Sequence, residues 1–229
     1  MAQISISLMT DTAKQRFQSL SLPAGVDRNS HVNYINGICS AIGRAWNMWQ
    51  SQATLTQVSV NGPMATGGRL SGPGLEPFIL SMAPPGWENY SRPIAAGIHN
   101  QWRGFQQEVR VPGLPWYPAF AAFPGPFAPP MPNVPCPLSA LSAQALRFMK
   151  EAEIARAISD KFGNPRPNCA NEVVKAVAAG VEKALYPWLS GTMITRVMGK
   201  GPIPSFAPPY VPVGPVVGGS GDNVAGGLS

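Results

Sequence analysis

The sequence contains few charged residues. Asp, Glu, Lys and Arg make up 12% of its 229 residues, whereas an ordinary soluble domain has about 25%. Mixed surface charge normally keeps proteins from associating, and the centres of protein interfaces are depleted of charge. The shortage therefore favours a protein whose surface is mostly covered by partners. A soluble monomer with a surface of Ser, Asn and Gln is the alternative.

Side chains that carry out catalysis or bind metals are also scarce. The histidines are His31 and His99, and the three cysteines, Cys39, Cys136 and Cys169, show no CxxC spacing. Neither a zinc site nor a complete disulfide framework is therefore indicated. A nucleophilic pair of Cys39 or Cys169 with His99 is arithmetically possible, but no nucleophile motif surrounds either cysteine. We expect a protein that is not an enzyme, with no catalytic residue, no cofactor and no metal.

Long apolar runs and clustered positive charges are missing as well. No stretch of about 18 apolar residues is free of proline and charge, so we expect no membrane span. The N-terminus lacks a basic segment followed by an apolar one, which favours synthesis and residence in the cytoplasm. The net charge is +6, but the cations are scattered singly between Lys14 and Lys200. Contact with nucleic acid is therefore open but weakly supported.

What the chain does contain is hydrophobic residues, at 45%, together with 26 prolines and 24 glycines. Apolar residues spaced at the helical period predict helices over about 33–52, 93–109, 138–162 and 171–189. Alternating apolar and polar residues predict short strands at "QISISL", near the N-terminus, and at "LTQVSV", which follows the first helix. Asn61-Gly62 predicts a turn.

Two segments, 111–137 and 201–229, are too rich in proline for a helix or a central strand. They are also too apolar to stay disordered. We therefore predict a mainly α fold with short strands, a small helical core, much irregular structure and long extended Pro/Gly-rich arms. The predicted order is an N-terminal helical and strand region (1–110), a Pro-rich linker or arm (111–137), a C-terminal helical pair (138–200) and an extended C-terminal arm (201–229).

Three segments carry a resemblance to a known class of proteins: "VNGPMATGGRLSGPGL", "VPGLPWYPAF" and "GKGPIPSFAPPYVPVGPVVGG". Together with the low charge and the small apolar-aromatic helices, they resemble structural proteins of tailed-phage particles and related phage-tail-like machines. The resemblance implies arms that lie over neighbouring subunits and a place in a virion assembled in the host cytoplasm. It assigns no role to any single residue, and it leaves open capsid decoration or vertex, neck and tail accessory.

We therefore expect a non-enzymatic structural subunit of a large symmetric assembly, whose partners are copies of itself and other structural proteins of the particle. Deleting residues 203–229 is expected to prevent assembly while the monomer still folds. The interface candidates are apolar residues of the helices and arms: Trp46, Trp49, Trp102, Phe105, Trp116, Tyr117, Phe120, Trp188, Phe206, Tyr210, Val213 and Val216.

The alternative function is a cytoplasmic adaptor or scaffold. Its Pro-rich segments "PGLPWYP" and "APPYVPVGP" would bind partner domains through aromatic grooves, which recognise a preformed extended backbone.

Overall fold

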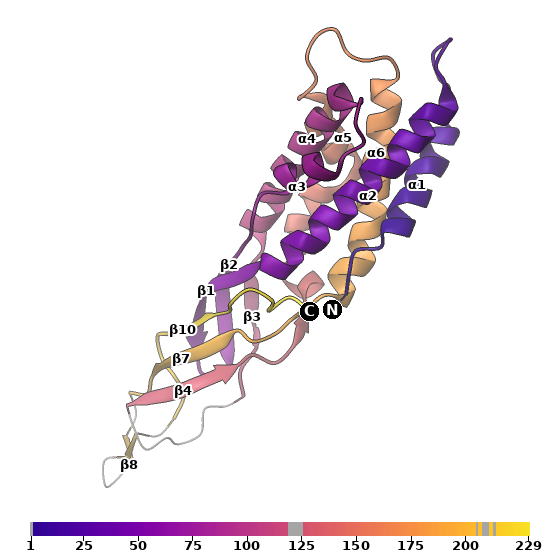
Figure 1. Ribbon diagram of the computed structural model, residues 1–229. Coiled ribbons are helices and arrows are strands. Elements are labelled where there is room, and N and C mark those ends of the chain that lie inside the picture. The colour runs from indigo at the N-terminus through magenta and orange to yellow at the C-terminus, as the bar shows by residue number, and fades with distance from the viewer. Residues whose placement is uncertain (1, 119–125, 205, 208–210, 213) are drawn as a thin grey trace.

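The computed structural model describes residues 2–118, 126–204 and 214–229, and the backbone of 206–207 and 211–212. The molecule is elongated, with helices at one end and a sheet at the other (Figure 1). The two chain termini lie beside each other where the two halves meet. We call the α-helices with their 3-10 turns the helical end. The sheet end comprises residues 54–74, 111–137 and 192–229.

Side-chain caps explain where the first two helices begin. The Ser5 hydroxyl accepts a hydrogen bond from the Leu8 N–H at 3.2 Å, and the Asp27 carboxylate accepts one from the Asn29 N–H at 3.0 Å. Both caps satisfy an N–H that the first helical turn leaves unpaired. The helical end consists of α1 (Ile6–Gln18), α2 (Arg28–Gln52), α3 (Leu75–Met82), α4 (Glu88–Glu108), α5 (Glu151–Ser159), α6 (Ala170–Gly191) and the 3-10 turns Leu138–Leu141 and Ala145–Met149.

Three predicted helices are confirmed, with corrected starts. The helix expected from residue 33 is α2, which begins at Arg28 because Asp27 is its cap. The helix expected from Pro93 is α4, which begins at Glu88 and holds Pro93 in its second turn. The last is α6, which follows Cys169.

Two other local predictions were wrong. The "QISISL" segment is no strand, since its second half (residues 6–8) begins α1, where Met9, Ala13 and Phe17 recur at the helical period and are buried. The helix expected over 138–162 is broken into two 3-10 turns and α5, with Lys150 extended between them. A contact distant in sequence sets this start, because the Glu151 N–H donates to the Glu182 carboxylate of α6 at 2.7 Å.

The sheet has six antiparallel strands in the order β3-β2-β1-β10-β7-β4. The predicted turn at Asn61-Gly62 is confirmed, as Gly62 takes a φ of +60° between paired Asn61 and Met64. The strands of this sheet are β1 (Thr54–Asn61), β2 (Met64–Ser71), β3 (Val111–Pro115), β4 (Phe127–Pro132), β7 (Met198–Pro202) and β10 (Gly219–Asp222). Two small pairs join β5 (Cys136–Pro137) to β6 (Met193–Ile194) and β8 (Phe206–Ala207) to β9 (Val211–Pro212).

Trp116 and Tyr117, which follow β3, fill the buried side of this sheet. They are 1% and 2% exposed. Gly199 and Gly221 leave room for the Tyr117 ring, since an added Cβ on either would lie 2.5 Å from a Tyr117 atom. The Trp116 N–H donates to the Pro63 carbonyl, and the Trp116 carbonyl accepts from the Val134 N–H, both at 2.6 Å. These bonds join the chain after β3 to the turn between β1 and β2 and to the chain after β4, so the sheet curls around the two aromatic rings.

The predicted fold class is therefore wrong. Instead of long extended arms outside a small helical core, the Pro/Gly-rich segments supply strands β3, β4, β7 and β10 of the sheet. The prolines of β3 and β4 are tolerated because these are edge strands, where a missing N–H breaks no ladder. Pro202 is the last residue of the interior strand β7. The central strand β10 is the proline-free sequence Gly219–Asp222. A buried core continues from the helices into the sheet.

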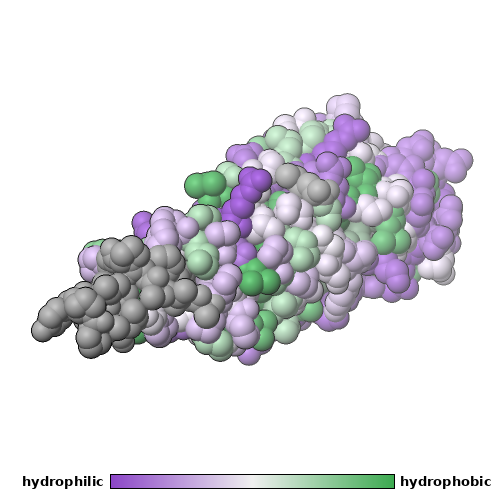
Figure 2. All heavy atoms as spheres, turned by 90° about the horizontal axis from the view of Figure 1, so that it is seen from below, coloured by the Kyte–Doolittle hydropathy of each residue, from purple (hydrophilic) through white to green (hydrophobic). Residues whose placement is uncertain are grey.

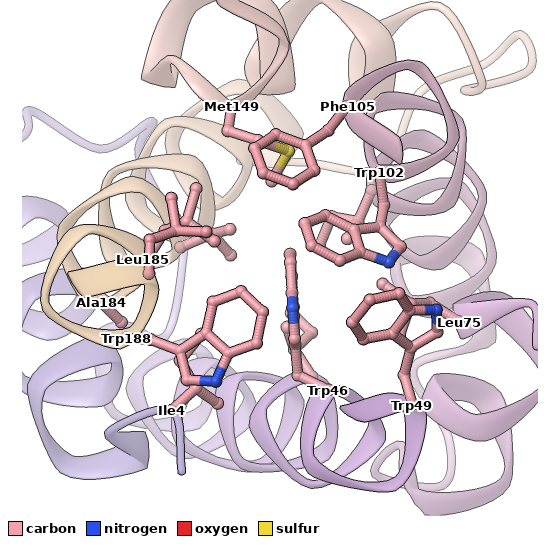
Figure 3. Close-up of a cluster of buried hydrophobic side chains, with 14 of the residues drawn as sticks. Ile4, Trp46, Trp49, Leu75, Trp102, Phe105, Met149, Ala184, Leu185 and Trp188 are labelled. Atoms are coloured by element: carbon pink, nitrogen blue, oxygen red, sulfur yellow. The ribbon is translucent and has the colours of Figure 1, made fainter. Parts of the chain in front are cut away.

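Four tryptophans and a phenylalanine form the centre of the helical end (Figure 3). Trp102 of α4 contacts Trp46 and Trp49 of α2 with ring centroids 4.6 and 4.7 Å apart, and it stacks on Phe105 at 4.6 Å. The Trp188 indole N–H donates to the Gln50 side chain at 2.9 Å. The Gln50 amide in turn donates to the Leu228 carbonyl at 3.4 Å. This chain of bonds attaches the C-terminus to the helices.

Candidate interaction surface

Most of the predicted interface residues lie in the core of this chain rather than on its surface. Each of them has at most 2% of its surface exposed, so none is available to a partner of the folded chain. They are Trp46, Trp49, Trp102, Phe105, Trp116, Tyr117, Trp188 and Val216. The prediction that Trp116, Tyr117 and Val216 lie in grooves of neighbours is therefore corrected, because these residues cover the sheet of their own chain.

The side-chain exposure of the other four candidates lies outside what the structure describes. Phe120, Tyr210 and Val213 fall outside the residues that the structure describes, and Phe206 belongs to β8 with only its backbone described. The same holds for most of the "APPYVPVGP" segment. The "PGLPWYP" segment lies in β3 and the turn after it, where Trp116 and Tyr117 are buried.

Charge is divided unequally between the two ends of the molecule. The sheet end carries four charged residues, Arg69, Arg196, Lys200 and Asp222. The ion pairs among the described residues all join residues of the helical end, such as Arg16 with Glu151 at 3.2 Å. The shortage of charged residues is thus greatest at the sheet end.

The sheet end also exposes large hydrophobic side chains. Phe127 on edge strand β4 is 67% exposed, and Val224 after β10 is 76% exposed. In Figure 2 hydrophobic residues reach the surface at several places along the molecule, and hydrophilic residues gather at the helical end. Seven of the nine large hydrophobic residues that are exposed in the described chain belong to the sheet end: Met64, Leu114, Phe127, Val134, Met198, Val217 and Val224.

The edges of the sheet are protected against pairing with further strands. Edge strand β3 contains Pro112 and Pro115, and edge strand β4 contains Pro129, Pro130 and Pro132. Proline has no N–H to donate to a further strand, which is a known protection against indefinite edge-to-edge association. A partner at this end would therefore bind through side chains rather than by adding a strand.

Sequence reasoning missed this surface, although a signal for it was present. Residues 111–146 contain no charged side chain. That run marks the stretch from β3 to β4 and beyond, yet it was interpreted through its prolines alone. The exposed positions within it, such as Leu114 and Phe127, could not be separated from the buried ones without the strand register.

The two histidines lie on different helices, α2 and α4. His31 lies against Phe17, Trp87 and Tyr90, with its Nδ1 2.9 Å from the Asp27 carbonyl oxygen. His99 lies on α4, at the junction of the two ends. Within the described residues, no three His, Cys, Asp or Glu side chains group as metal ligands would.

We predict that the thiols react slowly in the folded protein. Burial raises the pKa of Cys39 to about 12 and the pKa values of Cys136 and Cys169 to about 11. Because the thiolate is the reactive form, modification by a chromogenic disulfide reagent at pH 8 should be roughly 100-fold slower than in denaturant. A thiol that reacts equally fast in both states would contradict this and revive the Cys–His pair.

The same shifts give the sign of a pH effect on stability. The folded-state pKa values lie above the unfolded value of 9.0, so the folded protein retains protons that the unfolded chain releases. The contribution of the protonated thiols to the free energy of unfolding is therefore complete below about pH 9. It decreases as the pH rises through the folded-state pKa values.

None of the helices in the described residues is both long and apolar enough to cross a membrane.

Comparison of the chain with models of protein families, with curated proteins and with solved structures gives no significant match.

Proposed function

We propose that this chain is a non-enzymatic structural subunit of a large symmetric assembly of the phage-virion type, and that it binds neighbouring copies of itself through the sheet end. The observation that carries the proposal is the coincidence of few charges with seven exposed hydrophobic side chains at that end. Interface centres are depleted of charge and enriched in aromatic residues.

A shallow cavity beside Phe127 supports this choice of surface. Its volume is about 340 Å³, and its walls come from β4, β7 and β10, including Ala128, Gly201 and Gly219. An exposed ring next to an apolar hollow gives a neighbour both a group to cover and a recess to fill. Fully desolvated aromatic anchors contribute most of the binding energy in typical interfaces.

The proposal of a phage-type assembly rests on the sequence resemblance. The fold adds which end of the subunit would face its neighbours. The three resembling segments contribute β1 and β2, β3, and β7 of the sheet end. The helical end carries the ion pairs and most of the charge. A subunit of this polarity would bury its sheet end against neighbours and present its helices to solvent, in a virion assembled in the host cytoplasm.

The experiment is sedimentation of the purified full-length chain and of Phe127→Asp over a range of concentrations. We expect the wild type to self-associate and Phe127→Asp to weaken association roughly 100-fold, since burying an unpaired carboxylate costs several kcal/mol. The thermal midpoint should be unchanged, because Phe127 is 67% exposed.

Met48→Asp is the matched control. Met48 is 41% exposed on α2, in the helical end, so the same change there should leave association intact. A wild type that stays monomeric at high concentration, or equal loss in both variants, would overturn the proposal.

A further inference from the structure

A cavity of about 420 Å³ lies where the two ends of the molecule meet. It is formed by the end of β2, the Gly72-Pro73-Gly74 loop that leads into α3, and one side of α4. The geometry points to a binding site for a small molecule that bears an oxyanion, a phosphate or carboxylate group, held by Arg69 of β2 and by Arg103 and Gln106 of α4. This site is separate from the proposed contact surface around Phe127.

Positive charge in this cavity has no partner within the described protein. Arg69 and Arg103 both line the cavity, and both make neither an ion pair nor a side-chain hydrogen bond to another described residue. By contrast, Arg16, Arg147 and Arg156 pair with carboxylates. Two unpaired guanidinium groups facing one cavity are suited to oxyanions, because each offers several N–H donors in a planar fork.

Gln106 provides an independent indication of a ligand. Its residue is only 8% exposed, yet its side-chain amide forms no hydrogen bond to the described protein, and it lines the cavity. The amide is thus not tied to the described protein, and it is free to donate to a ligand bound in the cavity.

Two glycines of the loop that lines the cavity pack closely against neighbouring side chains. An added Cβ on Gly72 would lie 2.4 Å from Trp49 Nε1, and one on Gly74 would lie 3.3 Å from the His99 ring. Gly74, which lines the cavity, is the N-cap of α3 and makes no side-chain hydrogen bond to it. The positive end of the α3 dipole therefore lies beside the cavity and favours a negative charge.

The lining also limits what the ligand can be. No Phe, Tyr or Trp lines this cavity, and the imidazole of His99 is the aromatic ring that its described walls contain. The volume exceeds that of one phosphate, which leaves room for a polar body beside the anionic group. Glu76, in the first turn of α3, carries the carboxylate that raises the pKa of His99. Its negative charge disfavours an anion on that side of the ring.

His99 makes the site measurable. Burial lowers the pKa of His99, Glu76 opposes this change and Arg103 adds to it. A bound oxyanion near the ring would raise that pKa. The experiment follows the imidazole NMR signals of the full chain during titration with inorganic phosphate, with citrate, and with sodium chloride at matched ionic strength. His31, which lies among Phe17, Trp87 and Tyr90, is the internal control.

We expect the His99 signals to shift saturably with phosphate or citrate, and His31 to stay unchanged. Saturation by phosphate alone identifies a phosphorylated ligand, and saturation by citrate alone a carboxylated one. Shifts that chloride reproduces, or no saturable shift with either anion, overturn the proposal. The readout is a local ring, so its outcome is independent of whether the chain assembles.

Substitutions then test the named residues. Arg69→Gln and Arg103→Gln should each weaken anion binding roughly tenfold or more, as expected for a lost charge-assisted hydrogen bond. Both side chains are exposed, so the thermal midpoint should not change. Arg92→Gln, an exposed position on α4 outside this cavity, is the matched control. Unchanged binding in Arg103→Gln, or an equal loss in Arg92→Gln, contradicts the site.

Discussion

A chain that lacks residues 203–229 is expected to lose the cooperative fold of its sheet end, not only its ability to assemble. The sequence had suggested the opposite, a folded monomer without its arm. The deleted segment contains β10, which pairs with β1 on one side and β7 on the other. Removing a central strand leaves two unpaired edges and exposes the core under them, and exposed edges of this kind promote aggregation.

The segment is also fixed by its side chains. Asp222 and Asn223 accept hydrogen bonds from the backbone N–H groups of Gln57 and Leu55. Buried Leu228 bridges to Ile194 and accepts from Gln50. Circular dichroism and urea unfolding of the deleted chain measure the effect. A cooperative transition with an unchanged midpoint would show that the strand is dispensable.

A point variant separates this contribution from chain length. Asn223→Ala keeps the strand but leaves the Leu55 N–H without its acceptor, and should lower the free energy of unfolding by about 1–3 kcal/mol. Val224→Ser changes the adjacent residue, which is 76% exposed, and should have little effect.

Trp102→Ala is expected to reduce the free energy of unfolding by about 3–5 kcal/mol, the usual cost of removing a large aromatic side chain from a core. The Trp102 ring is fully buried and lies near Trp46, Trp49, Phe105 and Trp188 (Figure 3). Its indole nitrogen makes no hydrogen bond to the described protein, so the loss comes from packing and the cavity left behind.

The measurement is urea unfolding followed by circular dichroism, since the substitution alters tryptophan fluorescence. Trp102→Phe retains a ring in the stack and should cost clearly less than alanine. Met48→Ala, at an exposed position of α2, should be nearly neutral. Equal and small losses for Trp102→Ala and Met48→Ala would mean that the cluster does not hold the helices together.

Periodicity alone located the three longest helices because their buried faces are continuous over many turns. In α2, Ile38, Ile42 and Trp49 all lie on the buried stripe. The same reasoning failed for the expected helix over 138–162. There the start of α5 depends on the Glu182 carboxylate, a residue 31 positions away in sequence, and no local pattern contains that acceptor.

Proline content was given too much weight in the prediction of extended arms. It disfavours helices and central strands, and the prolines of β3 and β4 do lie on edge strands, although Pro202 ends the interior strand β7. It does not exclude a folded sheet. The glycines that make room for Tyr117, and the proline-free β10, decide that the segments fold back onto their own chain.

For the candidate sites, too, some features follow from the sequence and others from the tertiary structure. The sequence by itself determined that charge and catalytic groups are scarce and that long amphipathic helices form, because composition and period are local properties. The tertiary structure decided which aromatic residues are buried, which end of the molecule carries the exposed apolar side chains, and that Arg69, Arg103 and Gln106 line one cavity. These outcomes depend on strand register and on contacts between residues far apart in the chain, which single-sequence patterns do not contain.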